Sequence, residues 1–309
     1  MTSLRMRFHM TVINSVDLFW SLASGEFSRR DGFDEGKNRF KFVFRSMLTL
    51  PWTLRWLDTF RSQALLTYLR RNPRLACKLH RPYLYRTLSV RGKLQALQTH
   101  YQLLEQRFGE QARRQLLSNG PLPLATLAGK NDGQLHILLT QQHSFDKEGE
   151  MSLQVCNADK VPLATLTFTL TRRNDQVVVV IGGLQGPSKP HGAESVQQAT
   201  KLAHGLFPKR LAMETLTTLA RRVGADQVLA VGKCEHIYSS WRYRRNFFAD
   251  YDSFWETLDA ETVDNKRFFR IPLTLARKAI TDIASKKRAE YQRRYALLDD
   301  LSAQTLAAL

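Results

Sequence analysis

The sequence predicts an α/β protein in which a basic helical region precedes a mixed, mainly antiparallel sheet with one parallel βαβ crossover. Hydrophobic residues recur at helical spacing up to about residue 117 and alternate with a period of two beyond residue 135. Residues 177–231 then read as an apolar strand, a glycine-rich loop, two helical patterns and a second short apolar strand, which is the order of a crossover. The chain has 309 residues, enough for two ordinary domains. We therefore expect a basic helical region over residues 1–130 and a mixed-sheet domain over residues 131–309.

The formal net charge of +18 is concentrated in the first part of the chain. Residues 1–130 hold 22 Lys and Arg against 8 Asp and Glu, and residues 39–93 hold 13 basic residues against one acid, Asp58. This asymmetry indicates an anionic partner. A basic surface on ordinarily packed helices is one interpretation. A second is contact with an anionic membrane surface, with Trp52, Trp56 and Phe60 at the headgroup level. Nucleic acid is the third, because basic and aromatic side chains also suit phosphate contact and base stacking.

An amphipathic helix is expected over Leu94–Leu117, ended by the turn formers and proline of Ser118–Pro121. Short polar turns then separate successive strands, which predicts an antiparallel meander. The expected strands are Leu135–Thr140, Met151–Cys156, Val161–Thr171 and Gln176–Ile181. His143 and Glu148 lie on or near the first hairpin turn, so both side chains are expected to be exposed.

The crossover is the stretch around which we expect a site to be built. Its first strand ends at Gly182-Gly183, and a loop is expected from Leu184 to Gly192. Its further elements are helices over Glu194–His204 and Pro208–Val223 and a strand over Val228–Val231. Ligands of such units usually bind beyond the carboxyl ends of the strands. The sequence therefore places a site near Gln185 or Lys233.

Candidate catalytic residues follow the last crossover strand. Glu235 and His236 occupy that position, and His236 is the residue best placed for a general base, although a packed structural pair would read the same. His204, before Gly205, suits a helix cap. A last strand over Arg267–Ile271 and a long charged helix over Leu273–Leu306 complete the chain.

Cysteine usage and hydropathy bear on location. The three cysteines are far apart and form no CxxC pair, which suits a reducing compartment and indicates neither a disulfide framework nor a zinc site. We find no secretory signal pattern and no run of about 18 apolar residues. A cytoplasmic protein is expected, with peripheral contact at the inner membrane where the basic region meets anionic lipid.

Several segments resemble the VirK/YbjX family of Gram-negative bacteria. The main ones are Ile181-Gly182-Gly183-Leu184-Gln185-Gly186 and Ala199-Thr200-Lys201-Leu202-Ala203-His204-Gly205-Leu206-Phe207-Pro208-Lys209. Supporting pieces are His100-Tyr101, Glu148-Gly149, Tyr251-Asp252-Ser253-Phe254-Trp255, Ile271-Pro272-Leu273 and the tail Lys286–Tyr295. The resemblance runs from about Arg39 onwards. It implies a virulence-associated protein that acts in envelope maintenance and in resistance to cationic antimicrobial peptides, without implying a reaction.

The second half is similar, at the level of the fold, to GNAT-type acyl-CoA N-acyltransferases. That resemblance implies an acyl or aminoacyl donor, such as acyl-CoA, held near Gln185, Gly186 and Lys201 and at the helix start formed by Lys209 and Arg210. The Q/R-x-x-G-x-G/A loop of that class is missing before this helix, and an extra helix intervenes. A non-enzymatic binding, chaperone-like or regulatory factor that uses the basic surface therefore remains the alternative.

Overall fold

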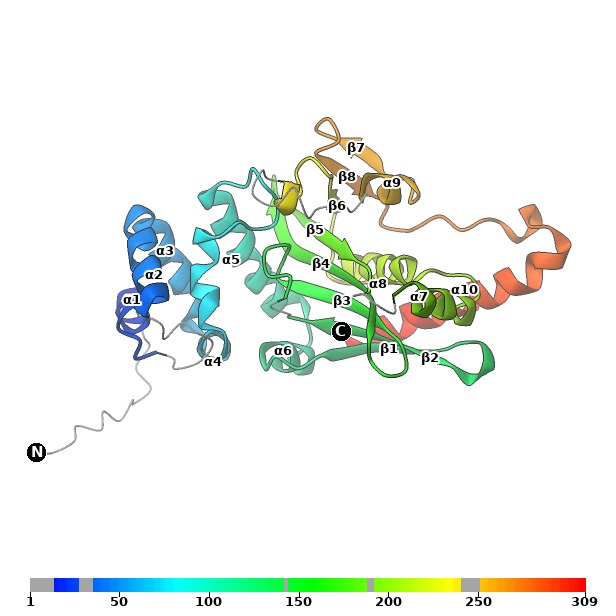
Figure 1. Cartoon of the computed structure of the whole chain (residues 1–309), viewed down its shortest axis with the longest axis horizontal. Helices are drawn as coiled ribbons and strands as arrows, with labels where there is room; N and C mark the ends of the chain where they lie inside the picture. Colours follow the sequence, from blue (N-terminus) through cyan, green and yellow to red (C-terminus); the bar gives the residue numbers. More distant parts are fainter. Residues whose placement is uncertain (1–13, 28–35, 142–143, 188–191, 240–250) are drawn as a thin grey trace, which may run out of the picture. The chain divides into compact units, whose positions relative to one another are not determined.

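The computed structural model describes residues 14–27, 36–141, 144–187, 192–239 and 251–309 (Figure 1). By contact, the chain divides into two compact units, Met1–Arg81 and Pro82–Leu309. The expected boundary after residue 130 differs from the boundary between these two units, which lies after Arg81. His143, which was expected to be exposed near the first hairpin turn, lies outside the described residues.

The first unit is helical. Its elements are α1 (Ser15–Ser24), α2 (Gly36–Leu48), α3 (Leu50–Asp58), a short 3-10 turn (Thr59–Arg61), α4 (Gln63–Arg71) and a 3-10 segment (Pro73–His80). Side-chain caps fix two of the helix starts. The Asn14 carboxamide oxygen accepts the N–H groups of Val16 and Asp17, and Ser62 Oγ accepts that of Leu65. Each cap satisfies backbone donors that have no partner within the helix.

Trp56 is the centre of the first unit's core. Its ring is fully buried, meets Phe60 edge-on at 4.7 Å between centroids, and donates its Nε1–H to the carbonyl oxygen of Leu75 at 3.1 Å. The spacing of Thr53, Trp56 and Phe60 places all three on one inward face of the chain. The expectation that Trp56 and Phe60 contact a membrane surface is therefore wrong, because both rings are buried in the core of the first unit.

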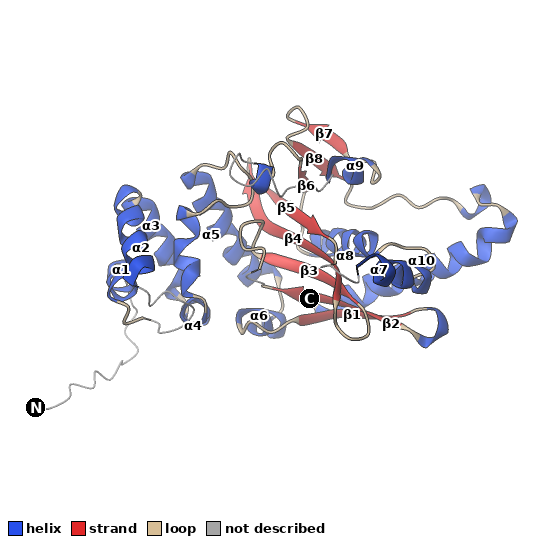
Figure 2. Ribbon diagram, viewed as in Figure 1, coloured by secondary structure: helices blue, strands red, loops and turns tan. Residues whose placement is uncertain are grey.

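The second unit combines helices with a mixed sheet (Figure 2). Its helices are α5 (Val90–Arg107), α6 (Glu110–Leu117), α7 (Gly192–Leu202), α8 (Pro208–Arg222), α9 (Tyr251–Glu256) and α10 (Ser285–Ala308). Its strands are β1 (Leu122–Ala128), β2 (Gln134–Thr140), β3 (Met151–Cys156), β4 (Pro162–Arg173), β5 (Gln176–Gln185), β6 (Gln227–Val231), β7 (Glu261–Val263) and β8 (Phe268–Ile271). Short 3-10 turns lie at Lys130–Asp132, Ile237–Ser239 and Ile280–Asp282.

The sheet has the order β1-β2-β3-β4-β5-β6-β8-β7. Every neighbouring pair is antiparallel except β5 and β6, which are parallel and are joined through α7 and α8. The predicted class, an α/β protein with a helical N-terminal region and a mixed sheet with one crossover, is confirmed. The finer likeness to GNAT-type enzymes stays a prediction.

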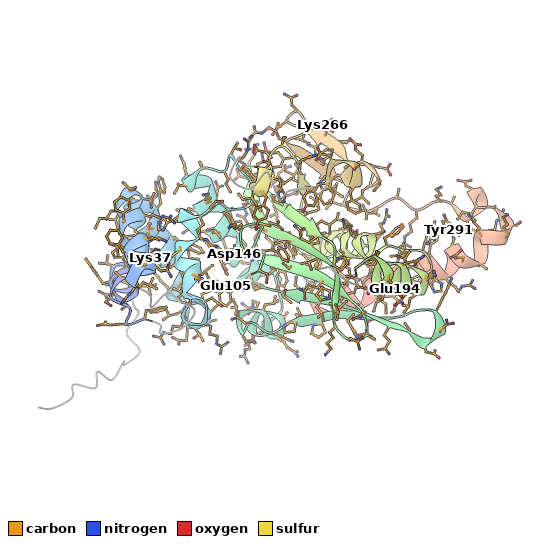
Figure 3. The ribbon with its side chains drawn as sticks, viewed as in Figure 1. Lys37, Glu105, Asp146, Glu194, Lys266 and Tyr291 are labelled. Carbon is orange, nitrogen blue, oxygen red and sulfur yellow. The ribbon has the colours of Figure 1, made fainter. Side chains whose placement is uncertain are left out.

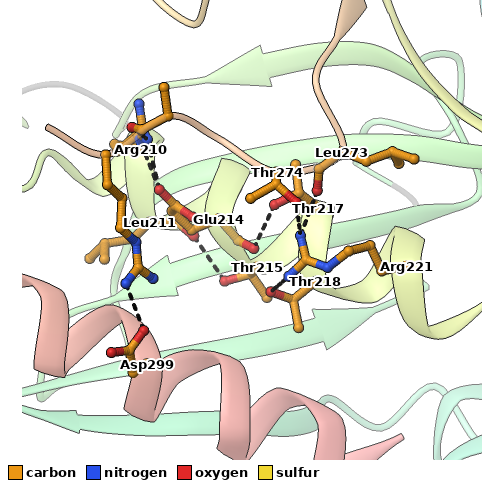
Figure 4. Close-up of polar contacts among 12 residues, drawn as sticks. Arg210, Leu211, Glu214, Thr215, Thr217, Thr218, Arg221, Leu273, Thr274 and Asp299 are labelled. Atoms are coloured by element: carbon orange, nitrogen blue, oxygen red, sulfur yellow. Dashed lines mark hydrogen bonds and ion pairs between the residues drawn. The ribbon is translucent and has the colours of Figure 1, made fainter. Parts of the chain in front are cut away.

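Helices pack on the central strands from more than one direction. In the view of Figure 1, α5 lies on one side of strands β3 to β5, and α7, α8 and α10 lie on the other. The His100 Nδ1 atom of α5 accepts a hydrogen bond from the backbone N–H of Leu170 in β4 at 3.2 Å. This bond between a side chain and the backbone ties the helix to the sheet. Polar contacts also tie α8 to the segment before α10, since Arg221 donates to the carbonyl oxygen of Leu273 (Figure 4).

The structure corrects several expected boundaries. The helix expected over Leu94–Leu117 is two helices, because the chain leaves helical geometry at Phe108 and turns at Gly109, whose N–H donates to the Leu309 carbonyl oxygen at 2.9 Å. The last helix begins at Ser285, after an extended stretch, and not at Leu273. Strands β1 and β7 were not anticipated. Across the described residues, no helix is both long and apolar enough to cross a membrane.

Candidate functional site

Strand β5 runs on through Gly182 and Gly183 to Gln185, where the sequence suggested a loop from Leu184. Its register with β4 pairs Thr167 with Gly183 and Phe168 with Ile181, which leaves Gly182 as the extra residue of a β-bulge. Bulges of this kind bend a strand and re-aim its side chains, and they are common beside active sites. The expected loop at Leu184 was wrong because the glycines bulge the strand without ending it.

The two glycines let Glu148 lie directly on the bulge. A Cβ atom at Gly182 would stand 1.9 Å from the Glu148 backbone carbonyl oxygen, and one at Gly183 would stand 2.0 Å from its carboxyl Oε2. Both contacts are far shorter than any real Cβ contact. Only glycine fits at position 182, where the neighbour is backbone, whereas at position 183 the Glu148 side chain would have to move. Glu148 is completely buried. The expectation of an exposed Glu148 was therefore wrong: its turn folds onto β5 instead of projecting into water.

Burial gives the Glu148 carboxyl unusual chemistry. Its Oε1 accepts a hydrogen bond from Gln185 Nε2 at 3.0 Å, and its Oε2 has no hydrogen-bond partner among the described residues. Loss of solvation raises the pKa of Glu148 to about 8, and the Gln185 hydrogen bond acts weakly in the opposite direction. At neutral pH the group is therefore predominantly a neutral carboxylic acid.

His236 faces this carboxyl group. Its Nδ1 accepts the Tyr238 N–H at 3.3 Å, which assigns the hydrogen of the neutral ring to Nε2, the atom 3.7 Å from Glu148 Oε1. Burial lowers the pKa of His236 to about 4, against a smaller opposing effect of a hydrogen bond with the Gly182 backbone. Tyr251 stacks on the ring at 4.9 Å between centroids. At 3.7 Å the two groups are too far apart for a hydrogen bond, and we describe them as a neutral acid beside a neutral imidazole.

Gln185 connects this buried pair with the end of the strand. Its Nε2 donates to Glu148 Oε1 and also to Tyr251 Oη at 2.8 Å. Both hydrogens of the side-chain amide are thus used, and the side-chain carboxamide oxygen of Gln185 can accept a hydrogen bond from an N–H or O–H group of a ligand. We call Glu148, Gln185, His236 and Tyr251 the Glu148 cluster.

Polar side chains continue from the Glu148 cluster across one face of the sheet. The strand register sets Gln154, Thr165 and Gln185 in one row and Ser152, Thr167 and Gly183 in the next. The hydroxyls of Ser152 and Thr167 are hydrogen-bonded at 3.0 Å, and both side chains are buried. Because burying polar groups is costly unless they are paired, a polar row inside a sheet is typical of a site more than of a packing core.

An apolar cavity of about 500 Å³ lies at the far end of β5. It is lined by Leu163, Gly186, Pro187, Val196, Gly205, Leu206, Phe207, Pro208, Lys209, Arg210, Phe254, Thr257 and Leu258. We call it the α8 cavity, since the first residues of α8 form one wall. Leu163 is the extra residue where the register of β3 and β4 shifts, so a second bulge shapes the cavity. Its volume is within the range of about 300–1,000 Å³ that is usual for small-molecule sites.

The five predicted donor-binding residues fall into three groups. Gly186, Lys209 and Arg210 line the α8 cavity, Gln185 adjoins it within the Glu148 cluster, and Lys201 is exposed on α7 outside both.

The two cations of the cavity differ in their partners. Arg210 is ion-paired with Glu214 at 2.8 Å (Figure 4). Lys209 lies 5.7 Å from the centre of the Phe254 ring and has no carboxylate partner among the described residues, and partial burial lowers its pKa. Lys209 is thus the cation that is available to an anionic or carbonyl-bearing ligand.

The other predicted catalytic residue, Glu235, lies in different surroundings from His236. Its carboxylate accepts a hydrogen bond from Thr87 Oγ1 at 2.7 Å and lies 3.4 Å from an Arg267 nitrogen and 3.9 Å from one of Arg86. Thr87 and Arg267 belong to the wall of a second cavity, of about 480 Å³, at the opposite ends of β4 and β5. The structure therefore brings His236 into the Glu148 cluster and places the Glu235 carboxylate elsewhere.

Sequence reasoning missed Glu148 and Tyr251 as members of the site. Glu148 was interpreted as an exposed turn residue, and Tyr251 was given no role in a site. The available signal was that both lie in short segments that carry the family resemblance, Glu148-Gly149 and Tyr251-Asp252.

The fold and the site together define a mixed-sheet α/β protein with a bulged crossover strand, a buried acid–imidazole pair and an adjacent apolar cavity. The family model described as "Protein of unknown function (DUF535)" matches residues 31–307, and the chain belongs to this family. It is 40% identical over 296 residues to the YbjX protein of Escherichia coli (strain K12), which covers 94% of this chain and 89% of that protein. A Haemophilus influenzae protein is 29% identical over 214 residues, or 69% of this chain and 70% of its own. No solved structure matches.

Proposed function

We propose that this protein binds an acyl donor, with the acyl chain or the apolar arm of an acyl thioester in the α8 cavity, and that it serves envelope maintenance and resistance to cationic peptides. One observation carries the proposal: three residues expected to hold a donor, Gly186, Lys209 and Arg210, line one apolar cavity of about 500 Å³ at the end of the crossover strand. The cellular setting rests on the VirK/YbjX resemblance.

The chemistry of the cavity suits a chain with a polar head. Its walls are mainly aliphatic and aromatic, so an apolar chain would be favoured by release of water from both surfaces. The first turn of α8 has no side-chain cap at Phe207. Pro208 has no N–H and the Arg210 N–H donates to the Phe207 carbonyl oxygen at 2.9 Å, so the backbone N–H and the ammonium of Lys209 are the groups that can face a phosphate or thioester oxygen. The side-chain carboxamide oxygen of Gln185 can accept a hydrogen bond from an amide N–H of the acyl donor.

Acyl transfer is the finer form of the proposal. An acceptor amine or hydroxyl would attack the thioester carbonyl carbon, the C–S bond would break, and the proton of the acceptor would end on the released thiol. His236 and Glu148 take no direct part in this step, because both side chains are buried and 3.7 Å separates Nε2 from Oε1. We assign Glu148 as a positioning residue, because its carboxyl accepts a hydrogen bond from Gln185, and His236 as the neutral ring that lies beside this carboxyl.

Thermal unfolding with acetyl-CoA, palmitoyl-CoA and free palmitate tests the proposal. A ligand that binds only the native state at a hundredfold excess over Kd adds ~2.7 kcal/mol, a shift on the order of 5–10 °C for a unit of this size. Lys209→Ala should abolish most of the shift with palmitoyl-CoA. Lys201→Ala removes the same group from the exposed face of α7 and should leave the shift unchanged.

The outcomes separate the versions of the proposal. The unfolding temperature could rise with palmitoyl-CoA and palmitate while no thioester is consumed in the presence of amine acceptors. That result would support a lipid-binding protein and would contradict the acyl-transfer activity. Absence of any shift with all three compounds would overturn acyl-donor binding altogether.

A further inference from the structure

Helix α2 of the first unit carries its large apolar residues on the outside. Only Phe42 and Ser46 of this helix are buried, whereas Phe40, Phe44, Met47 and Leu48 are between 57% and 76% exposed. Residues 40, 44, 47 and 48 follow the i, i+4, i+7, i+8 spacing of one helical stripe. A soluble helix normally turns such a stripe toward the core, so α2 presents an apolar stripe that the unit itself does not bury.

Neighbouring helices add further exposed apolar side chains. Trp20 and Val16 of α1 and Leu50 at the start of α3 are also exposed. Trp20 contacts Phe19, whose ring meets the buried Phe42 of α2, so α1 and α2 share one hydrophobic seam with apolar residues left outside it. We call the stripe of Phe40, Phe44, Met47 and Leu48 the α2 face. Exposed apolar groupings of this kind mark interaction sites.

The charge along α2 and α3 is of one sign up to Asp58. Residues 36–57 contain five basic residues and no acidic residue. Three of the five, Lys37, Lys41 and Arg45, are exposed on α2 itself, and Lys37 is labelled in Figure 3. Long basic side chains can lie along apolar surface while their charged ends reach out to anionic groups.

We propose that the α2 face is a peripheral docking surface for an anionic lipid bilayer, with α2 lying in the plane of the headgroups. Phe40, Phe44, Met47 and Leu48 would enter the boundary between headgroups and acyl chains, and the basic residues would meet lipid phosphates. A helix of 13 residues is about 20 Å long, which suits lying on a bilayer and is too short to cross one. The inference is independent of the α8 cavity, since all its residues belong to the first unit.

Two other partners fit these observations less well. Single-stranded nucleic acid stacks its bases on the faces of aromatic rings, but the rings of Phe40 and Phe44 lie nearly parallel on each other, 6.3 Å apart at 15°. Met47, Leu48 and Leu50 offer no stacking surface at all. A second copy of the chain would bring two basic faces together without any acid from α2 to offset the repulsion.

Co-sedimentation of the full chain with vesicles tests the inference. The vesicles would contain either phosphatidylcholine alone or 70% phosphatidylcholine with 30% phosphatidylglycerol, and poly-uridylate RNA would be compared at the same salt. We expect binding to the anionic vesicles that weakens as salt is raised, and tenfold or greater loss of binding in Phe40→Ser/Phe44→Ser. Lys37→Gln/Lys41→Gln should weaken binding by about fivefold per removed charge.

Matched variants keep the result interpretable. Val161→Ser removes an exposed apolar side chain from the second unit, and Lys286→Gln/Lys287→Gln removes two exposed charges from α10. Both should bind vesicles as the unaltered chain does. The inference is overturned if the chain ignores anionic vesicles, if Phe40→Ser/Phe44→Ser binds them normally, or if the variants lose RNA binding instead.

Discussion

The pKa of Glu148 is raised and the pKa of His236 is lowered relative to exposed residues of the same types. The native state holds Glu148 protonated up to about pH 8 and His236 neutral down to about pH 4, because neither can be solvated as an ion inside the second unit. With both groups neutral, no charge is placed in the interior, and the Glu148 carboxyl remains available as the acceptor that orients Gln185.

The two pKa shifts predict the pH dependence of stability. Between about pH 4.5 and 8 the unfolded chain releases the Glu148 proton and the native state keeps it, so stability falls as pH rises. Between about pH 4 and 6.5 the unfolded chain binds a proton at His236 and the native state does not, so stability rises with pH. The two slopes cancel from pH 4.5 to 6.5. Above pH 6.5 the Glu148 slope alone remains, at about 1.4 kcal/mol per pH unit.

Glu148→Gln should remove this fall. Glutamine keeps the acceptor oxygen for Gln185 and cannot ionise, so the free energy of unfolding from urea titrations should become flat between pH 6.5 and 8. The difference in this free energy between the variant and the unaltered chain should therefore grow by about 2 kcal/mol from pH 6.5 to pH 8. Glu194→Gln removes an exposed carboxylate from α7 (Figure 3) and should keep the original slope. Parallel curves for Glu148→Gln and the unaltered chain would mean that Glu148 is ionised in the native state.

At the level of elements, the bulge in β5 makes a prediction about backbone approach. Gly182→Ala would push a methyl group against the backbone carbonyl of Glu148, which cannot rotate away, whereas Gly183→Ala would meet the end of the Glu148 side chain, which can move. We expect Gly182→Ala to cost about 3 kcal/mol or more of stability, and Gly183→Ala to cost less. Gly186→Ala is the matched control, since its Cβ would meet nothing within 4 Å. Thermal unfolding of the three variants distinguishes them, and equal losses at Gly182 and Gly186 would contradict the close approach.

The same element shows how far the sequence predicts this structure. Strand period, short polar turns and the helix–helix crossover give β2 to β6 and β8 with α7 and α8, because local patterns determine them. The continuation of β5 to Gln185 could not be predicted, because glycine pairs also end strands and only the distant Glu148 explains why both are needed. The direction of α2 could not be predicted either. Arg39–Arg45 is compatible with an inward or an outward aromatic face, and the contacts of Phe42 with Phe19 of α1 and with His80 of the 3-10 segment decide it.

For the candidate site, the sequence predicted the position in the fold better than it predicted which side chains lie together there. Gln185, Gly186, Lys209 and Arg210 were found because the ends of crossover strands and the starts of helices are general binding positions. Glu148 and Tyr251 reach the site from a turn and from a short helix, and no local pattern records that a turn folds back onto a bulge. The pairing of His236 with Glu148, and not with the adjacent Glu235, is likewise a product of tertiary packing.

For the whole molecule, the two proposed surfaces belong to different compact units, so they should respond separately to their ligands. The α8 cavity lies in residues 163–258 of the second unit, and the α2 face lies in residues 40–48 of the first. Hydrogen exchange can follow both in one sample, because a bound ligand lowers the opening of the backbone that it contacts. We expect palmitoyl-CoA to slow exchange at the start of α8 and the end of β5 and to leave α1 and α2 unchanged. Anionic vesicles should slow exchange in α2 and leave α8 unchanged. Protection of α2 by palmitoyl-CoA in the Lys209→Ala variant would mean that the first unit, and not the α8 cavity, takes up the acyl chain.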